Sequence, residues 1–385
     1  MDKIALLNGK KLLFLINDPV FCGNGVSNKI QSQLDALSKL CAEVYYSYLS
    51  EDGSQRIILN HFFRTNKFIR LIPYLQRYYF KDLMNFIIAK EIDVLYIRYT
   101  HFASPGFNSF LKKLSQFKVS IILEFPTFPY DDEYQTLPLK SKVKLRIDKF
   151  FRSSLKKYVN NAVTFTDDAE IFGIPTIKIS NALSKSRIEY AYNHIQNSHK
   201  KELSQIKLVG VASMEKWHGY DRLLTGLARY VSRPDAKSVH LDLIGDGREL
   251  RILKDIANNL NINDFVTFHG HLEGERLNAL LLNADIGIDS LARHRAGNNK
   301  NNSLKSKEYL AFGLPIVKSH LDPSIDDSEF YINVPANESS INLNEIIGWF
   351  TDQQFSEKKL VISSYAKANF SWDSQMIKIL RSSLS

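Results

Sequence analysis

The chain has 385 residues, of which 44% are hydrophobic and 24% charged, and this balance excludes an intrinsically disordered protein. Two cysteines are too few for a disulfide framework, and no stretch approaches the ~18 consecutive apolar residues of a membrane span. The formal net charge of +9 favours an anionic partner, which is a phosphorylated substrate, a lipid surface or nucleic acid. The N-terminal apolar run is broken by Asn8, Gly9 and lysines, so we expect no signal peptide and predict a cytoplasmic protein.

Short β-rich apolar runs alternate with helical patterns along the chain, which predicts an α/β protein with parallel sheets built from βαβ units. The expected strands are 12–16, 44–48, 94–98, 119–124 and 162–165 in the first half, and 207–211, 239–244, 266–268, 286–288 and 316–318 in the second. A polar stretch at 192–204 separates the two series. We predict two Rossmann-like domains, 1–195 and 196–355, and a helical segment, 356–385, that packs back on the first domain.

Loops that follow the strands are the expected ligand sites, because open parallel sheets bind ligands at the carboxyl ends of their strands. After the first strand, Gly23, Asn24 and Gly25 would let the backbone approach a ligand. Gly245 and Gly247 follow another strand in the same way. Neither loop has the G-x-G-x-x-G spacing of a dinucleotide site, so each alone is also consistent with a tight turn. Together they outline an interdomain cleft.

Polar side chains near two strand ends of the first half are candidates for acceptor chemistry. Glu124 ends a strand and is followed by Tyr130 and Glu133, and such carboxylates can orient a hydroxyl or accept its proton. His101 follows the preceding strand and is a second candidate base. Arg98 either pairs with Glu124 or binds an acceptor phosphate.

Two basic segments of the first half fit an anionic surface. Residues 139–158 combine a helical apolar stripe with many lysines and arginines, and residues 61–81 interleave aromatic side chains with Arg and Lys. Such segments bind anionic lipid with ~1 kcal/mol per surface Lys or Arg. The alternative for either segment is a core helix with a solvated basic face. We predict peripheral association with the inner face of the plasma membrane. The apolar stripe consists of Leu139, Val143, Ile147, Phe150, Phe151, Leu155 and Tyr158.

The segment SLKSKEYLAFGLPIV, residues 303–317, predicts a helix that holds a phosphorylated ligand. Ser303 is a candidate N-cap, and Gly313 is a candidate C-terminal stop. The free N–H groups of a first helical turn attract phosphate, and Lys305 and Lys307 add positive charge. Glu308 can accept hydrogen bonds from a ribose diol. The alternative is an amphipathic helix with an ordinary surface glutamate. The expected buried stripe is Leu304, Tyr309, Leu310 and Phe312.

Four segments of the second half resemble, in order and spacing, the donor domain of GT-B glycosyltransferases of the group 1, family 4 type. They read LVGVASMEKWHGYDRLLTGL, LDLIGDGREL, FVTFHGHLEGERLNALLLNADIGI and SLKSKEYLAFGLPIV. The first-half stretches VLYIRY and LEFPTFPYDDEY are similar to those of bacterial capsule or exopolysaccharide enzymes. The resemblance implies the GT-B fold, in which the parallel sheets of two Rossmann-like domains face an interdomain cleft.

The resemblance also implies a reaction. A hexosyltransferase of this type moves a sugar, with retention, from a nucleotide diphosphate sugar to a hydroxyl of a glycan or lipid-linked saccharide, in surface polysaccharide synthesis and without a cofactor or metal. Glu308 matches the glutamate that holds the donor ribose, and Ser303, Leu304 and Lys305 form the turn that meets the diphosphate. The first glutamate of the same motif falls on Lys300, which is a departure from the family pattern.

The family's arginine and lysine for the donor phosphates fall on Ser213 and His218 in this chain. Lys216 is the nearest substitute cation, and we predict that it stabilises the charge that grows on the leaving diphosphate. Arg293 and Lys305 can share this task. His218 is either a donor-site residue or a packed loop histidine. The resemblance further implies close approach of the nucleotide at the two glycines of the second half and a base bordered by His269 and Leu272.

Two other classes of protein remain as alternatives. A catalytically silent glycosyltransferase-like subunit is favoured by the altered motif positions Lys300, Ser213 and His218. A basic nucleic-acid-binding protein is less favoured, because the basic segments lie in the first half while the phosphate-binding turns recur at strand ends. We therefore expect no nucleic-acid partner.

Overall fold

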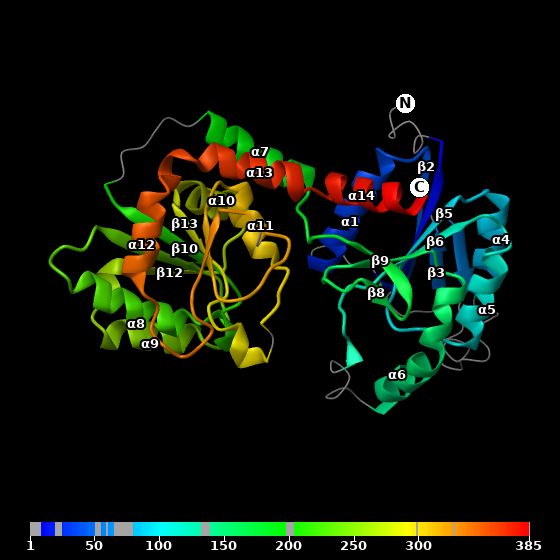
Figure 1. Ribbon diagram of the computed structural model, residues 1–385, viewed down its shortest axis with the longest axis horizontal. Coiled ribbons are helices and arrows are strands. Elements are labelled where there is room, and N and C mark those ends of the chain that lie inside the picture. Colours follow the sequence, from blue (N-terminus) through cyan, green and yellow to red (C-terminus); the bar gives the residue numbers. More distant parts are fainter. Residues whose placement is uncertain are drawn as a thin grey trace. The chain divides into compact units, whose positions relative to one another are not determined.

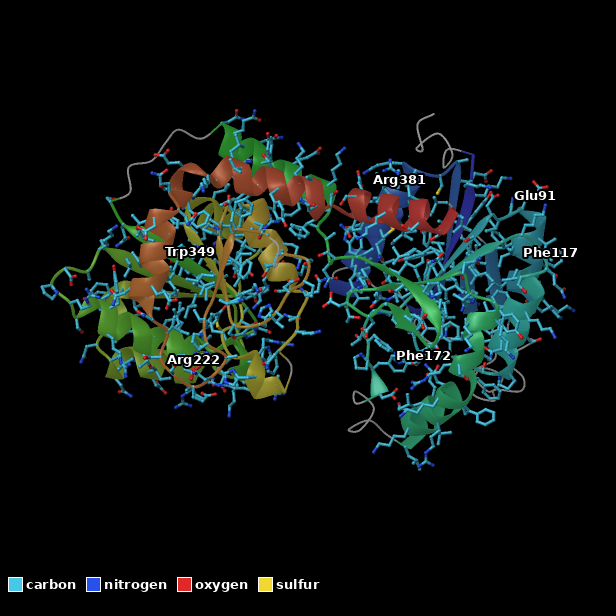
Figure 2. All side chains as sticks on the ribbon, in the orientation of Figure 1. Glu91, Phe117, Phe172, Arg222, Trp349 and Arg381 are labelled. Carbon is cyan, nitrogen blue, oxygen red and sulfur yellow. The ribbon has the colours of Figure 1, made fainter. Side chains whose placement is uncertain are left out.

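The computed structural model of the chain describes residues 9–19, 25–50, 55–58, 61–64, 80–131, 139–197, 204–297, 299–325 and 328–384. They form two compact units (Figure 1). The first unit contains Met1–Ser180 and Trp372–Ser385, and the second contains Asn181–Ser371. Each unit has its own hydrophobic core, and side chains fill the space between its layers (Figure 2).

The division between the units falls at Ser180 and not at the polar stretch expected to be a linker. Helix α7 (Lys185–Gln196) occupies the first part of that stretch and packs on α13 (Lys359–Asn369) within the second unit. The closing segment is helical as expected, but its two helices belong to different units. Helix α13 belongs to the second unit, whereas α14 (Trp372–Leu384) packs on α1 (Gly25–Ser38) in the first.

The described strands of the first unit form a nine-stranded sheet in the order β4-β3-β2-β1-β5-β6-β7-β9-β8. Its central strands pair in parallel, but β3, β4 and β8 at the two edges are antiparallel, which differs from the all-parallel expectation. In sheet order the strands are β4 (His61–Arg64), β3 (Gln55–Ile58), β2 (Glu43–Leu49), β1 (Lys11–Pro19), β5 (Val94–Arg98), β6 (Ser120–Glu124), β7 (Asn161–Thr164), β9 (Ile174–Lys178) and β8 (Glu170–Ile171).

Helices cover the two faces of this sheet. Helices α4 (Lys81–Ala89) and α5 (Pro105–Leu114) pack together on one face, and α1 and α14 lie on the other (Figure 1). Helix α5 begins where the sequence requires it, because the Ser104 hydroxyl accepts a hydrogen bond from the Phe107 N–H at 3.2 Å and Pro105 occupies the first turn.

Helix α6 (Leu139–Phe151) continues into a 3₁₀ turn, η2 (Arg152–Lys157). The expected apolar stripe is only partly buried. Leu155 is buried, whereas Leu139, Val143 and Phe150 are 76%, 46% and 78% exposed. The helix instead turns Leu145 and Asp148 toward the core, because the Tyr99 and Tyr130 hydroxyls donate hydrogen bonds to the Asp148 carboxylate.

The described strands of the second unit form a six-stranded parallel sheet in the order β12-β11-β10-β13-β14-β15. Helix α8 packs on α9 and α12 along one side, and α7 packs on α10, α11 and α13 along the other (Figure 1). The strands are β12 (Val266–Gly270), β11 (Val239–Ile244), β10 (Ile206–Val211), β13 (Ile286–Ile288), β14 (Ile316–Lys318) and β15 (Tyr331–Asn333), and the helices are α8 (Tyr220–Val231), α9 (Leu250–Asn259), α10 (Gly274–Asn283), α11 (Leu304–Ala311) and α12 (Leu343–Asp352).

The strand order of the second sheet reverses between β10 and β13. In doubly wound sheets this switch point opens a crevice at the carboxyl ends of the strands, where ligands bind. All ten strands expected from the sequence are present, with ends that shift by a few residues. A ligand site is therefore expected at the carboxyl ends of β10 and β13.

Candidate functional site

The loops after β10 and β13 are joined by their backbones. The first loop contains the 3₁₀ turn η3 (Lys216–His218), and the second contains η5 (Arg293–Ala296). The His218 carbonyl accepts from the Leu291 N–H at 2.9 Å, and the Trp217 carbonyl accepts from the Ala292 N–H at 3.2 Å. Between them Gly219 has φ +67°, and a Cβ there would lie 2.8 Å from the Cβ of Ala292. The two loops thus form one connected platform.

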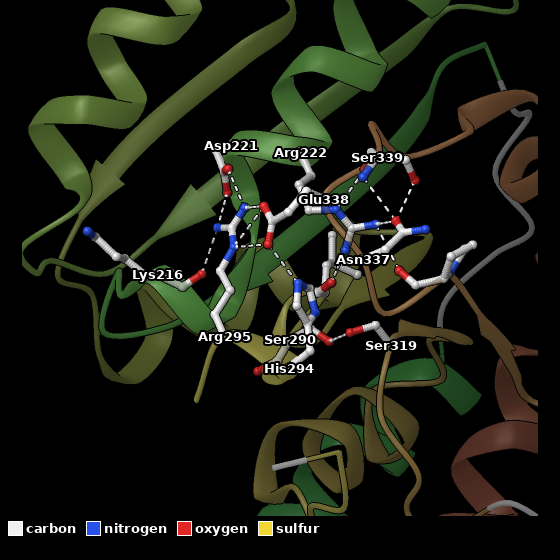
Figure 3. A network of polar contacts seen from close by, with 12 residues as sticks. Lys216, Asp221, Arg222, Ser290, His294, Arg295, Ser319, Asn337, Glu338 and Ser339 are labelled. Carbon is white, nitrogen blue, oxygen red and sulfur yellow. Dashed lines mark hydrogen bonds and ion pairs between the residues drawn. The ribbon is translucent and has the colours of Figure 1, made fainter. Parts of the chain in front are cut away.

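Arg295 of η5 links its own loop to η3 and to helix α8 (Figure 3). Its guanidinium lies between two carboxylates, donating to Asp221 at 2.8 and 2.9 Å and to Glu338 at 2.5 and 3.0 Å, and it also donates to the Lys216 carbonyl at 3.0 Å. His294 lies 2.7 Å from the same Glu338 carboxylate. These contacts hold the pKa of Glu338 down to about 2, mainly through the Arg295 hydrogen bonds, so the pair stays charged at neutral pH.

The glycines after β11 have a packing role. A Cβ on Gly245 would lie 1.8 Å from the Ala212 carbonyl oxygen, and one on Gly247 would lie 2.6 Å from that of Met214. Their φ angles of +126° and +150° are also unfavourable for other residues. The turn after β11 therefore packs directly on the loop after β10. The close approach of a nucleotide to these glycines stays a prediction.

A group of charged side chains gathers at the carboxyl end of β13. The buried Asp289 carboxylate lies 3.0 Å from the Lys305 ammonium and accepts from the Ser306 hydroxyl at 2.5 Å. Burial alone would raise the pKa of Asp289, but the Lys305 charge and these hydrogen bonds lower it far below its ordinary value. Lys305 also donates to the Ser290 hydroxyl at 3.3 Å, so it is anchored at this strand end.

Arg293 brings a second positive charge close to this group. The Arg293 Nε is buried and has no hydrogen-bond partner among the described residues. Burial lowers the pKa of Arg293, while the Asp289 charge raises it. Burial together with Lys305 and Arg293 also lowers the pKa of His218 to about 3, so this buried ring is neutral at physiological pH. Two cations against one carboxylate leave a positive field at the strand end.

Helix α11 begins at this point with its first turn uncapped. Ser303 occupies the predicted N-cap position, but its side chain makes no capping hydrogen bond. Gly313, with φ +73°, ends the helix as predicted. Leu304, the first residue of α11, is 50% exposed and is not part of the buried stripe that was expected. Lys305 lies in this first turn, and helix N-termini attract anions through their N–H groups.

Lys307 was expected to add to this positive charge, and that expectation is wrong. Its ammonium lies 2.5 Å from the Asp322 carboxylate, and both side chains are fully buried. Burial lowers the pKa of Lys307, with the Asp322 charge opposing. The Asp322 carboxylate also accepts from the Ser303 N–H at 3.1 Å. Lys307 therefore stabilises the start of α11 through Asp322, which binds both its ammonium and the Ser303 N–H.

Glu308, the candidate ribose ligand, lies partly exposed on α11 and is paired with Arg187 of α7. Its Oε1 accepts from Arg187 Nε at 2.9 Å and from Nη2 at 2.6 Å. Its Oε2 accepts no hydrogen bond from the residues that the structure describes. A carboxylate oxygen with free acceptor sites can take hydrogen bonds from sugar hydroxyls.

The remaining second-unit candidates lie around the same strand ends. Lys216 is exposed, and its side chain points away from the carboxylates that hold Arg295 (Figure 3). His269, at the end of β12, lies 2.7 Å from the Asp242 carboxylate, and Leu272 is half-buried. Lys300 is exposed and pairs through its backbone with Leu321. None of these positions excludes the predicted donor contacts.

Glu124 does not offer the accessible carboxylate that was expected. It is fully buried at the end of β6 and accepts from Gln33 at 2.8 Å, from the Tyr96 hydroxyl at 2.6 Å and from Arg98 at 2.7 Å, while Lys29 lies 3.8 Å away. Burial opposes ionisation, but these partners lower the pKa of Glu124. Arg98 thus makes the first of its two predicted interactions. The cluster is a buried charge network and not an accessible base.

His101 and Tyr130 stack on one another at the end of β5, with ring centroids 3.6 Å apart. Tyr130 is buried and donates to Asp148 at 2.6 Å, so it does not face solvent as an acceptor ligand would. Burial lowers the pKa of His101 to about 3, which makes the ring a weak base near neutral pH. Gly23, Asn24 and Glu133 lie outside the described residues, and Gly25 begins α1.

Sequence reasoning missed Arg187, Asp289 and Arg295. Asp289 carried a weak signal, because it directly follows a predicted strand. Arg187 and Arg295 carried no such signal, because their partners are distant in the chain. Glu308 lies 121 residues from Arg187, and the partners of Arg295 lie 43 to 79 residues from it. In the described ranges no three His, Cys, Asp or Glu side chains gather in a way that could hold a metal ion.

Comparison with protein families matches residues 192–328 to the family described as "Glycosyl transferases group 1". Comparison with curated proteins gives no significant match. This family match covers the platform, the turn after β11 and helix α11.

Solved structures share the fold over nearly the whole chain. A glycosyltransferase from Rickettsia africae ESF-5 has a TM-score of 0.60 and 14% identity, covering 98% of each chain. Anabaena HepE in complex with UDP has a TM-score of 0.55 and 14% identity, covering 97% of this chain and 100% of the other. Arabidopsis thaliana starch synthase IV bound to ADP and acarbose has a TM-score of 0.57 and 11% identity, covering 98% and 99%. The GT-B fold predicted from the sequence is confirmed.

Proposed function

We propose that this chain, a glycosyltransferase whose residues 192–328 belong to the group 1 family, moves a sugar from a nucleotide diphosphate sugar to a hydroxyl of a glycan or lipid-linked saccharide. The observation that carries the proposal is the start of α11, which has no side-chain cap and brings Lys305 to the same strand end as Arg293, because such a positive helix start is suited to a diphosphate. Anabaena HepE has been solved with UDP and with UDP-glucose, which supports a nucleotide-sugar donor here. Surface polysaccharide synthesis is the context we assign to the reaction.

The residues of the second unit supply electrostatic stabilisation in this proposal. Negative charge grows on the leaving diphosphate as the bond to the sugar C1 breaks, and donors already in place lower the energy of that state. The N–H groups at the start of α11, Arg293 and Lys305 are held in place by the buried Asp289 and by the platform. Lys216 is an exposed cation in η3 of the same platform, and we assign it to the phosphates. Neutral His218 can donate a hydrogen bond without altering the net charge.

Retention at C1 and the absence of a metal remain part of the proposal. We assign acceptor recognition to the first unit, without a role for the buried Glu124 as a base. His101 stays a candidate only as a hydrogen-bonding partner, because a pKa of about 3 makes proton uptake unfavourable.

A screen of the purified chain against UDP, GDP, ADP and TDP sugars tests the donor assignment. We expect one nucleotide sugar to raise the thermal unfolding midpoint and to be hydrolysed slowly, and Glu308→Ala to lose most of both effects. Arg233→Ala is the control, since it removes an exposed ion pair with Asp235 at the surface of the second unit. If no nucleotide sugar raised the unfolding midpoint or was hydrolysed, the result would contradict the proposal and favour a catalytically silent subunit.

We further propose that α6 rests on an anionic membrane surface. Its outer face presents the exposed Leu139, Val143 and Phe150 among the exposed basic residues Lys142 and Arg146. Apolar side chains that project between basic ones are suited to the boundary between lipid headgroups and acyl chains. No helix in the described part of the chain is long and apolar enough to cross a bilayer. The second basic segment, 61–81, lies mostly outside the described residues.

Vesicle flotation tests this surface. We expect vesicles with phosphatidylglycerol to bind the chain, vesicles of phosphatidylcholine alone to bind it weakly, and Phe150→Ser to reduce binding. Phe117→Ser is the matched control, because Phe117 is also an exposed phenylalanine (47%) but lies outside α6. Equal losses for the two variants, or none for Phe150→Ser, would contradict the assignment to α6.

A further inference from the structure

Arg187 connects helix α7 to the candidate ribose ligand. Both of its hydrogen bonds to Glu308 end on the same oxygen, Oε1, at 2.9 and 2.6 Å. An ionised carboxylate oxygen has about two acceptor sites, so the two N–H donors occupy Oε1. The described residues leave the acceptor sites of Oε2 open, and two sites are enough for the two hydroxyls of a ribose.

Arg187 is itself held on three sides. Its Nη1 donates to the Asn278 side-chain oxygen, and its guanidinium lies 4.6 Å from the centre of the Phe312 ring. Asn278 and Phe312 are buried, on α10 and just after α11. A planar guanidinium fixed by a ring and by hydrogen bonds loses little further freedom when it binds a carboxylate. The orientation of the Glu308 carboxylate is therefore set before any ligand arrives.

We infer that Arg187 is a positioning residue for nucleotide recognition, which holds Oε1 of Glu308 so that Oε2 is presented to the ribose hydroxyls of the donor. The inference rests on the proposed function, because it takes Glu308 as the ribose ligand. It adds to that function a basis for discriminating between ribonucleotides and deoxyribonucleotides. A side chain fixed in advance binds its partner without a further loss of rotamer freedom, so the preference for ribose over deoxyribose depends on Arg187.

Calorimetric titration of the full chain tests the inference with UDP, GDP and ADP, each beside its 2′-deoxy counterpart. We expect the wild type to bind one ribonucleotide about 10-fold or more tightly than its deoxy form, as loss of a hydrogen bond to a charged group predicts. In Arg187→Gln we expect this ratio to fall below about 3-fold, while the Kd of the deoxy form stays within about 2-fold. Loss of both affinities together is the pattern of a merely structural role and would overturn the inference.

Matched variants separate positioning from general damage. Lys185→Ala removes an exposed ion pair to Glu189 from the same helix, and we expect the wild-type ratio to persist. Asn278→Ala removes one anchor of the guanidinium while leaving its pair with Glu308, and we expect an intermediate ratio. In steady-state assays with the hydrolysed donor, Arg187→Gln is expected to raise KM about 10-fold with kcat changed less than about 3-fold.

The failures of the two proposals are distinguishable. A wild type that discriminates between ribose and deoxyribose, with an Arg187→Gln variant that discriminates equally well, overturns the inference and leaves the proposed function standing. A wild type that binds a nucleotide without any preference for ribose removes Glu308 from the ribose site and overturns the inference. A wild type that binds no nucleotide overturns both.

Discussion

Replacing Asp322 by asparagine tests whether the buried pair under α11 has the energetic role that its geometry implies. The variant keeps the size of the side chain but removes the charge that faces Lys307 at 2.5 Å, where both side chains are fully buried. Breaking a buried ion pair by removing one partner costs about 3–5 kcal/mol. A unit of this size loses about 2–4 °C of unfolding midpoint per kcal/mol, so we expect a fall of about 6–20 °C.

The effect of pH has a definite sign. The pKa of Lys307 is already lowered in the folded chain, mainly by burial, and loss of the Asp322 charge lowers it further. The folded variant then releases a proton that the unfolded chain keeps up to its ordinary pKa of about 10.4. Wherever Lys307 is neutral in the folded variant, the cost of removing its proton falls by about 1.36 kcal/mol for each unit by which the pH rises toward the ordinary pKa. The deficit of the variant should therefore shrink as the pH rises.

Thermal unfolding followed by tryptophan fluorescence at pH 7 and pH 9 provides the measurement, since Trp217 and Trp349 belong to the second unit. Asp235→Asn is the matched control, because its ion pair with Arg233 is 42% and 67% exposed and should contribute less than about 1 kcal/mol. A loss in Asp322→Asn no larger than in the control, or a loss equal at the two pH values, would refute the reasoning.

Three further outcomes are expected. Lys216→Ala should lower kcat about 10²- to 10³-fold in initial-rate assays, as removal of one charge-stabilising donor does, and an unchanged kcat would exclude Lys216 from that role. Gly245→Ala should lower the unfolding midpoint more than Gly297→Ala, because its Cβ would lie 1.8 Å from the Ala212 carbonyl oxygen whereas Gly297 has nothing within 4 Å and bears only the strain of its φ of +67°; equal midpoints would disprove the packing argument. Glu124→Gln should cost about 3–5 kcal/mol in chemical denaturation, since it removes the buried carboxylate charge that faces Arg98 at 2.7 Å and Lys29 at 3.8 Å, and should change kcat by less than about 3-fold; lost turnover at unchanged stability would restore Glu124 as a base.

The sequence determined the elements and their order. The ten expected strands are present because strands buried on both faces read as short apolar runs, and this signal is local. Five described strands, β3, β4, β8, β9 and β15, were missed, because each has only two to five residues and lacks the continuous apolar run by which the other strands were recognised. The beginning and end of α11 were also predicted, because the N-cap position of Ser303 and the left-handed Gly313 depend only on neighbouring residues.

The use of each polar side chain was decided by tertiary structure. Lys305 and Lys307 lie two residues apart on one helix, yet one borders the candidate phosphate site and the other is buried on Asp322. The partner of Glu308 lies 121 residues away in the chain. Burial and ion pairing depend on which elements meet in space, and a local sequence pattern contains no information about these distant contacts. The sequence by itself therefore determined ten strands, the start of α11 and a resemblance to group 1 glycosyltransferases over residues 192–328, whereas only the folded chain decided which charges can meet a ligand.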